Sequence, residues 1–223
     1  MKSNEQLQKD VMDSIKWEPQ LHAAEIGVAV HDGIVTLTGT VDNYSKKLAA
    51  ESATKDVAGV RAVVEKIDVK YHNLGIKTDD EIAAEVLKSL RNHWDVPDEK
   101  IQVEVDDSWV TLNGDVTWNY QKEAAKRAIE NIPGVKGVLN HIKIKALRKS
   151  ELEKRVIENA FRRHWSINAD DVHVTVDGNK VILTGKVTSM YQKEEAGRIA
   201  WKTPGVLFVE NNLVVDYKYE YVL

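Results

Sequence analysis

The chain of 223 residues contains no cysteine, so disulfide bonds cannot stabilise it and thiolate chemistry is excluded. Its N-terminus has no apolar run of signal-peptide length, and no stretch of about 20 apolar residues occurs in the sequence. We therefore expect no helix that spans a membrane. As given, the chain is expected to be cytoplasmic, whereas a mature form whose signal had been removed would be periplasmic.

The sequence also lacks an excess of basic residues and the motifs of common enzymes. It has 31 basic and 35 acidic residues, well mixed, and a net charge of −4, which does not fit a dedicated nucleic-acid binder. No phosphate-binding loop, zincin or hydrolase-elbow motif occurs, and the histidines show no metal-ligand spacing. We expect no enzyme, no cofactor and no metal, and only a deep pocket with convergent titratable groups would revive the enzyme hypothesis.

The strongest feature that is present is an internal repeat. The pattern Val-x-Leu-x-Gly-x-Val occurs three times, and each time a Gly-Val pair follows twenty positions after the central glycine. The central glycines are Gly39, Gly114 and Gly185, and the pairs begin at Gly59, Gly134 and Gly205. A repeat of this length indicates three copies of one small module rather than one domain. The predicted domains are residues 1–72, 77–146 and 148–217.

Each copy has the same predicted order of elements. An amphipathic helix comes first, with apolar residues such as Ile82, Val86 and Leu90 at helical spacing. Two strands with strict alternation follow, joined by a turn of Asp, Gly, Ser or Asn residues that tolerate positive φ. An alanine-rich helix and a third strand complete the copy. The sequence therefore predicts an α+β fold of three tandem α-β-β-α-β modules, each a three-stranded sheet with two helices on one face. Whether the third strand lies beside the first or the second stays open.

Two details of the modules call for a packing explanation. The central glycine lies on the apolar side of its strand, and we expect it to let the backbone of the alanine-rich helix approach closely. Asn140 and Asn211 align with Glu65 on the inward side of the third strand, and we expect the turn after Gly-Val to supply their partners.

The order of elements, the L-x-G-x-V strand and the later G-V pair resemble the BON domain, named for bacterial OsmY and nodulation proteins, over nearly the whole chain. The resemblance implies association with the bacterial cell envelope, osmotic stress and transport, and no catalysis. It also implies binding of phospholipid membranes, the function most often proposed for the domain. Many members carry a signal sequence or a lipidated cysteine, and this chain shows neither.

Aromatic residues at the start of the second helix, followed by basic residues, are the candidate lipid-binding site. A ring at headgroup level beside cations that meet phosphate is typical of a membrane contact, here an anionic surface. The alternative interpretation is a solvated helix face with a tyrosine that covers the core. The candidate residues are Tyr44, Lys46, Lys47, Trp118, Tyr120, Lys122, Lys126, Tyr191, Lys193 and Arg198.

Other aromatic residues support a rival hypothesis. The C-terminal segment 217–223 alternates tyrosine with other residues and could extend an edge strand, which pairs readily with other chains. Trp109 and Trp201 have no aromatic counterpart in the other copies and would suit contacts between modules or subunits. The rival is a self-associating structural or interaction scaffold, which predicts a homo-oligomer.

Tryptophans also lie near the ends of the first helices. These residues, Trp17, Trp94 and Trp165, are expected to cover an edge of the core.

Overall fold

The computed structural model describes residues 2–21, 26–70, 77–145, 154–164, 167 and 171–216. Module 1 contains α1 (Asn4–Trp17), β1 (Ile26–His31), β2 (Ile34–Val41), α2 (Tyr44–Lys55) and β3 (Ala62–Val69). Module 2 contains α3 (Asp79–Asn92), the short 3-10 helix η2 (Asp98–Lys100), β4 (Ile101–Asp106), β5 (Trp109–Val116), α4 (Asn119–Ile129), β6 (Gly137–Asn140) and β7 (Lys143–Ile144). Module 3 contains α5 (Lys154–Arg162), β8 (Val172–Asp177), β9 (Lys180–Val187), α6 (Met190–Trp201), β10 (Phe208–Asn211) and β11 (Val214–Val215).

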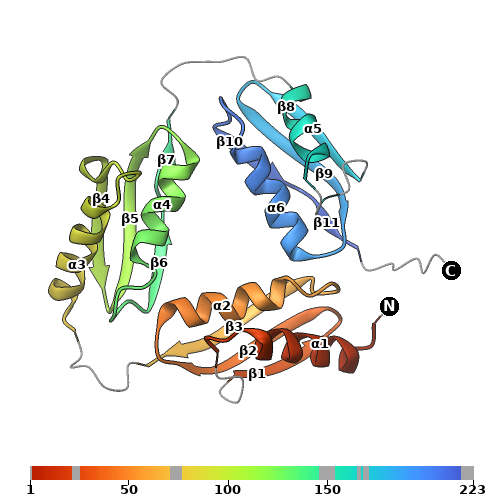
Figure 1. Cartoon of the computed structure of the whole chain (residues 1–223), viewed down its shortest axis with the longest axis horizontal. Coiled ribbons are helices and arrows are strands. Elements are labelled where there is room, and N and C mark those ends of the chain that lie inside the picture. Colours follow the sequence, from red (N-terminus) through yellow and green to blue (C-terminus); the bar gives the residue numbers. More distant parts are fainter. Residues whose placement is uncertain are drawn as a thin grey trace. The chain divides into compact units, whose positions relative to one another are not determined.

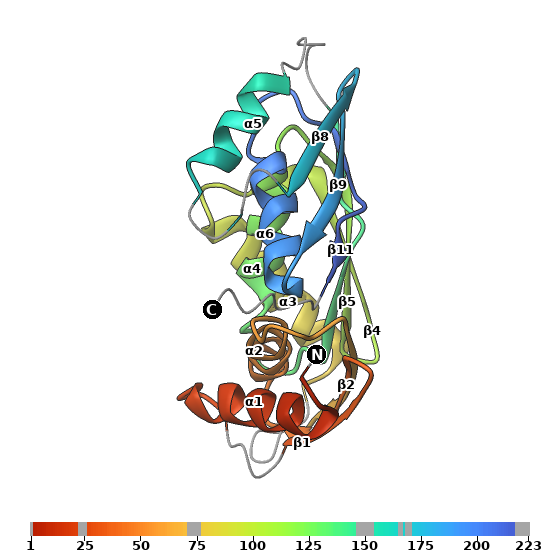
Figure 2. The ribbon, with the colours of Figure 1, turned by 90° about the vertical axis from the view of Figure 1, so that its right-hand side faces the viewer.

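The described residues form three separate small sheets, one in each module, and both helices of a module lie on one face of its sheet (Figures 1 and 2). The predicted α+β class is therefore confirmed. The second strand is central in every sheet. It pairs antiparallel with the first strand, with Ile101 opposite Gly114 and Val172 opposite Gly185. In modules 2 and 3 it pairs parallel with the third strand, which answers the open question of strand order.

The core of each module lies between the sheet and its helices. In module 2, Ile82, Val86 and Leu90 from α3 are buried, and Leu112 and Ile129 meet them from β5 and α4. In module 3, Ile157 and Phe161 pack in the same way with Leu183 and Ile199. The apolar stripe of the first helices is narrow, because Met12, Leu87 and Val156 from the predicted amphipathic faces are exposed.

Local sequence signals fix the element ends. Thr78 caps α3 in a capping box: its hydroxyl accepts a hydrogen bond from the Glu81 N–H, and the Glu81 carboxylate accepts one from the Thr78 N–H. The hairpin turns adopt the predicted positive φ at Asp32, Asp107 and Ser108.

The strand glycines do permit a close backbone approach, but the expected partner, the alanine-rich helix, is wrong. A Cβ on Gly114 would lie 2.1 Å from the Lys100 carbonyl oxygen, and one on Gly185 would lie 2.0 Å from the Asp171 carbonyl oxygen. Both glycines have positive φ, +142° and +122°. They are needed because the backbone that leads into the neighbouring strand comes so close, not because a helix approaches.

The asparagines of the third strand also have other partners than expected. Asn140 donates to the Lys122 carbonyl oxygen of α4 at 2.9 Å and accepts from the Ile142 N–H at 3.2 Å. Asn211 does the same in module 3 with Lys193 and Leu213, at 2.6 and 3.3 Å. Each amide therefore ties the second helix to the break between the two parts of the third strand.

Candidate functional site

The predicted aromatic residues differ in exposure at the start of the second helices. Trp118, Tyr120 and Tyr191 are 45 %, 53 % and 37 % exposed, whereas Tyr44 at the start of α2 is buried. Gln121 positions the start of α4, because its side-chain oxygen accepts from the N–H groups of Thr117 and Trp118 at 3.1 Å. Aromatic contact with a surface is thus available at α4 and α6.

Most of the predicted basic residues already have partners within their own module. Lys46 pairs with Asp42 at 2.8 Å and Lys126 with Glu130 at 3.8 Å, and Arg198 pairs with Glu195. Lys47 donates from its ammonium group to the Ile67 carbonyl oxygen at 2.9 Å. The side chains of Lys122 and Lys193 are half-buried. The predicted site therefore offers less positive charge to a lipid headgroup than the sequence suggests.

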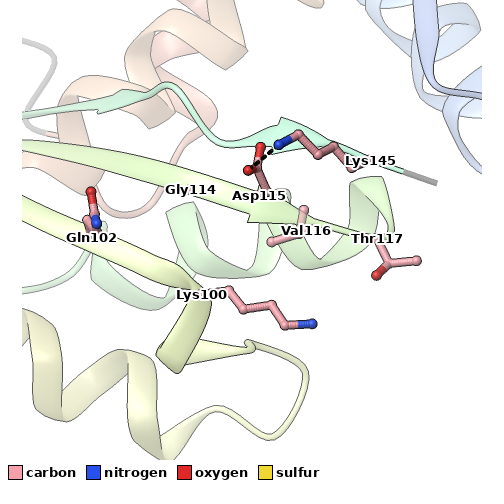
Figure 3. A pocket seen from close by; sticks show the side chains of 7 residues that line it. All are labelled: Lys100, Gln102, Gly114, Asp115, Val116, Thr117 and Lys145. Atoms are coloured by element: carbon pink, nitrogen blue, oxygen red, sulfur yellow. Dashed lines mark hydrogen bonds and ion pairs between the residues drawn. The ribbon is translucent and has the colours of Figure 1, made fainter. Parts of the chain in front are cut away.

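A pocket of about 540 Å³ opens at the same end of module 2 at which α4 begins. It lies there because β4 begins where β5 ends, with Ile101 opposite Gly114, and β7 ends beside β5, with Ile144 opposite Val116. Lys145 is turned toward Asp115, with nitrogen and oxygen 2.6 Å apart, and Lys100 extends along the other side of the pocket (Figure 3). The lining residues are Lys100, Gln102, Gly114, Asp115, Val116, Thr117 and Lys145.

The loop between α3 and β4 brings a highly exposed tryptophan to this end. Trp94 follows α3 and is 94 % exposed, while Val96 beyond it is buried and anchors the loop. Trp17 at the end of α1 in module 1 is 85 % exposed. The expectation that these rings cover the core is wrong, and Trp165 lies outside the described residues. We call Trp94, Lys100, Thr117, Trp118, Tyr120 and Lys145 the aromatic end of module 2.

Charges around the aromatic end are balanced. Lys100 and Lys145 line the pocket, whereas Asp95 and Glu99 lie in the loop that carries Trp94, and Asp98 pairs with Arg91 at 3.8 Å. Phosphate oxygens could accept from the two ammonium groups, but the site has no strong surplus of positive charge. The exposed aromatic surface is therefore the main feature of this site that favours binding.

Module 3 has a different charge pattern at the corresponding positions. Lys186 and Asp216 replace Asp115 and Lys145, so the cross-strand ion pair is kept with its signs exchanged, at 2.8 Å. The hydrogen bond that the Lys186 ammonium donates to the Asp216 carboxylate raises the pKa of Lys186 above its usual range. Asp171 stands where module 2 has Lys100. The pair is thus a structural brace between strands, and Lys100 is the cation that distinguishes module 2.

Module 3 contains a buried carboxylate whose charged partners reach the surface. Glu195 of α6 is nearly fully buried, and its carboxylate lies 3.1 Å from the His164 Nε2 atom and pairs with Arg198 through its other oxygen. Modules 1 and 2 have Ala49 and Ala124 at this position. The sequence pattern did not predict this group, because a glutamate within the second helix is typical of the polar face.

The described part of the chain holds no group of three or more His, Asp or Glu residues placed to bind a metal ion. None of its helices is long and apolar enough to cross a membrane. The fold is that of a repeat protein built from small α+β modules.

The chain belongs to the BON domain family. The family model, described as "BON domain", matches residues 3–71, 78–146 and 151–217. Osmotically-inducible protein Y of Escherichia coli (strain K12) is 30 % identical over 129 residues, which are 56 % of this chain and 64 % of that protein. An uncharacterized protein in the gshII 5′ region of Anaplasma centrale is 26 % identical over 125 residues, 55 % of this chain and 83 % of that protein.

Two solved structures show a distant likeness. Both are of CdsD, a structural protein of the type III secretion system of Chlamydia trachomatis. One is 15 % identical with a TM-score of 0.24 and covers 93 % of this chain and 91 % of that one. The other, its C-terminal domain, is 14 % identical with a TM-score of 0.25 and covers 96 % and 100 %.

Proposed function

We propose that this protein is a non-catalytic binding protein that attaches to phospholipid membrane surfaces through the aromatic end of module 2, and that Trp17 gives module 1 a separate contact of the same kind. The exposure of Trp94 and Trp17, at 94 % and 85 %, carries this proposal. An indole ring has an apolar body and a polar N–H group, and tryptophan is enriched where proteins meet the membrane interface.

The role of charge in the proposed contact is secondary. Lys100 and Lys145 suit the phosphate of a headgroup, so anionic lipid should strengthen binding. Asp95, Glu99 and the ion pairs of the neighbouring lysines limit that gain. The protein would therefore bind by inserting rings at headgroup depth, with the lysines orienting the module.

We place this activity at the bacterial envelope during osmotic stress. The support is membership of the BON family and a relative whose name describes osmotic induction. Increased abundance of the protein after an osmotic upshift, together with its recovery in envelope fractions, is the expected result. Unchanged abundance and recovery only in the cytosol would contradict this placement.

Co-sedimentation with vesicles tests the membrane contact directly. The protein should bind vesicles of phosphatidylethanolamine and phosphatidylglycerol, and Trp94→Ala should weaken binding about tenfold, since burying a large apolar side chain contributes roughly 1.5–3 kcal/mol. Trp109→Ala is the matched control, because Trp109 begins β5, whereas the pocket lies where β5 ends. Equal binding by Trp94→Ala, by a second variant, Trp17→Ala, and by the parent protein would refute the proposal.

Self-association is the second candidate function, and one observation favours it. The strand β3 is an uninterrupted edge strand of eight residues, and such edges pair with other chains. In modules 2 and 3 the corresponding strand is divided into two short pieces.

A further inference from the structure

The first strand of module 3, β8, lies at one edge of its sheet, and β9 is its neighbour in the described sheet. The Lys186 N–H donates to the Asp171 carbonyl oxygen at 3.1 Å, so these opposed residues form a bonded pair. Bonded and unbonded pairs alternate along an antiparallel ladder, and the next pair, Val172 and Gly185, is therefore unbonded. The N–H and C=O groups of Val172 and Val174 thus point away from β9, along the open edge of β8.

A pocket of about 200 Å³ lies where this open edge meets α5. The buried ring of Phe161 forms part of its wall on the side of α5. Lys154 at the start of α5 and Arg162 at its end bring two cations to the pocket. Glu158, the one acid among the lining residues, pairs with Lys154 at 3.3 Å. The pocket therefore places positive charge beside backbone groups that can pair with another strand.

The first helices of the other modules do not offer this positive charge. α5 has three basic residues and one acidic residue, whereas α3 has two basic and four acidic residues, and α1 has two basic and three acidic residues. Module 2 has Ala83 in place of Lys154. Its Arg91, the counterpart of Arg162, pairs with Asp98 at 3.8 Å. An acidic partner would therefore favour module 3.

The corresponding edge of module 1 is covered by a side chain of its own helix. Gln8 of α1 donates from its side-chain nitrogen to the Val28 carbonyl oxygen at 2.8 Å, and Val28 is the counterpart of Val174. Module 3 has Lys154 at the position of Gln8, and this ammonium group pairs with Glu158 instead. Within the described part of module 3, the edge that Gln8 covers in module 1 is therefore available to a partner.

We propose that module 3 binds an extended acidic segment of a partner protein, which adds as an antiparallel strand to the open edge of β8 beside α5. Antiparallel pairing is slightly more stable per residue than parallel pairing. Backbone hydrogen bonds to Val172 and Val174 supply affinity, and carboxylates on the helix side meet Lys154 and Arg162. The contact is independent of membrane binding and is tested without lipid. The C-terminal segment 217–223, whose sequence could extend an edge strand, lies outside the described residues and is not needed for this contact.

The two faces of the added strand make different contacts. Val172 and Val174 are buried, so their side chains lie on the helix side of the sheet, whereas His173 is exposed on the other side. The side chains of two opposed residues in an antiparallel pair lie on the same face. The partner residues that bond to Val172 and Val174 are therefore the residues whose side chains face α5.

Fluorescence anisotropy with the full chain and a labelled peptide of alternating glutamate and threonine provides the test. The glutamates should face α5, so their backbone N–H groups should face β8. Methylation of the glutamate backbone nitrogens should therefore abolish binding, whereas methylation of the threonine nitrogens should leave it nearly unchanged. Glutamine in place of glutamate should weaken binding about tenfold or more.

Variants of the protein test the cations of the pocket. Lys154→Gln with Arg162→Gln should weaken binding of the peptide about tenfold or more. Arg155→Gln with Arg163→Gln is the matched control, because it removes the same charge from exposed residues that do not line the pocket. The control should bind like the parent protein, and circular dichroism checks that each variant is folded.

Several outcomes would overturn the proposal. They are absence of binding at about 1 mM peptide, equal binding of the two methylated peptides, and an equal loss of binding in the control variant. A peptide that does not bind, together with loss of vesicle binding in the Lys154→Gln, Arg162→Gln variant, would show that α5 contacts lipid and not a peptide.

Discussion

The central glycines of modules 2 and 3 permit a close backbone approach within their sheets. Gly114 and Gly185 combine positive φ with a backbone carbonyl where a Cβ would stand. Any side chain would have to push apart the backbone between η2 and β4, or that before β8. Because the obstacle is backbone rather than a flexible side chain, rotamer changes cannot relieve it.

Gly114→Ala should therefore destabilise module 2 by roughly 2–4 kcal/mol, from the strained φ together with the clash. Urea denaturation followed by far-UV circular dichroism measures the change. Gly178→Ala is the control, because its φ is +57° and no atom lies within 4 Å of the added Cβ. That variant should lose only about 1–2 kcal/mol, the usual cost of left-handed backbone. Equal losses in both variants would show that the close carbonyl is unimportant.

A second prediction at the scale of single residues concerns the buried carboxylate of Glu195. His164→Ala removes the imidazole beside a buried oxygen and should cost about 1–3 kcal/mol of unfolding free energy. Glu195→Ala restores the alanine of the other modules and should be close to neutral, since it removes the buried charge itself, and the His164 and Arg198 side chains that remain reach solvent. In the double variant, the cost of His164→Ala should largely vanish. Additive effects in this cycle, measured by thermal unfolding, would show that the two groups are not coupled.

At the scale of elements, the second helix and the third strand are joined by the asparagine bridge. Asn140→Ala leaves the Lys122 carbonyl oxygen and the Ile142 N–H without their bonds to this side chain, and should cost about 1–3 kcal/mol. Asn212→Ala removes an exposed side chain that bonds only to Glu210 in the described structure, and should change stability by less than about 0.5 kcal/mol. Hydrogen exchange of the β7 amides would locate the effect, and unchanged protection in Asn140→Ala would contradict it.

The elements themselves could be predicted from the sequence because apolar spacing repeats three times. The period of 3.6 gave Ile82, Val86 and Leu90 as a buried helix face, and the period of two gave the strands. The contacts of polar groups could not be predicted in this way. Asn140 reaches a helix carbonyl that is 18 residues away in sequence, and periodicity shows only the side of the strand on which it lies.

The candidate site was harder to predict than the fold, because side-chain exposure and ion pairing also depend on contacts that periodicity does not show. The aromatic positions Trp118, Tyr120 and Tyr191 are exposed as a surface contact requires, but whether they bind lipid stays a prediction. The number of lysines overestimated the positive charge, because carboxylates four residues away in the sequence, such as Asp42 and Glu130, pair with them. Exposure of Trp94 depends on the course of a loop, which local sequence does not fix.

For the whole molecule, the balance of charge determines how membrane binding should respond to salt. The chain carries a net charge of −4, so long-range attraction to an anionic surface is absent, and only local cations such as Lys100 favour it. Salt screens exposed charges beyond about 8 Å at physiological ionic strength and leaves apolar burial intact. Raising salt from about 0.01 to 0.5 M should therefore weaken vesicle binding less than Trp94→Ala does. Lys100→Ala should remove most of the salt dependence that exists, whereas Lys180→Ala, in module 3, should not. Vesicle binding that disappears at high salt while tolerating Trp94→Ala would show that charge, and not the exposed indole, holds the protein to the membrane.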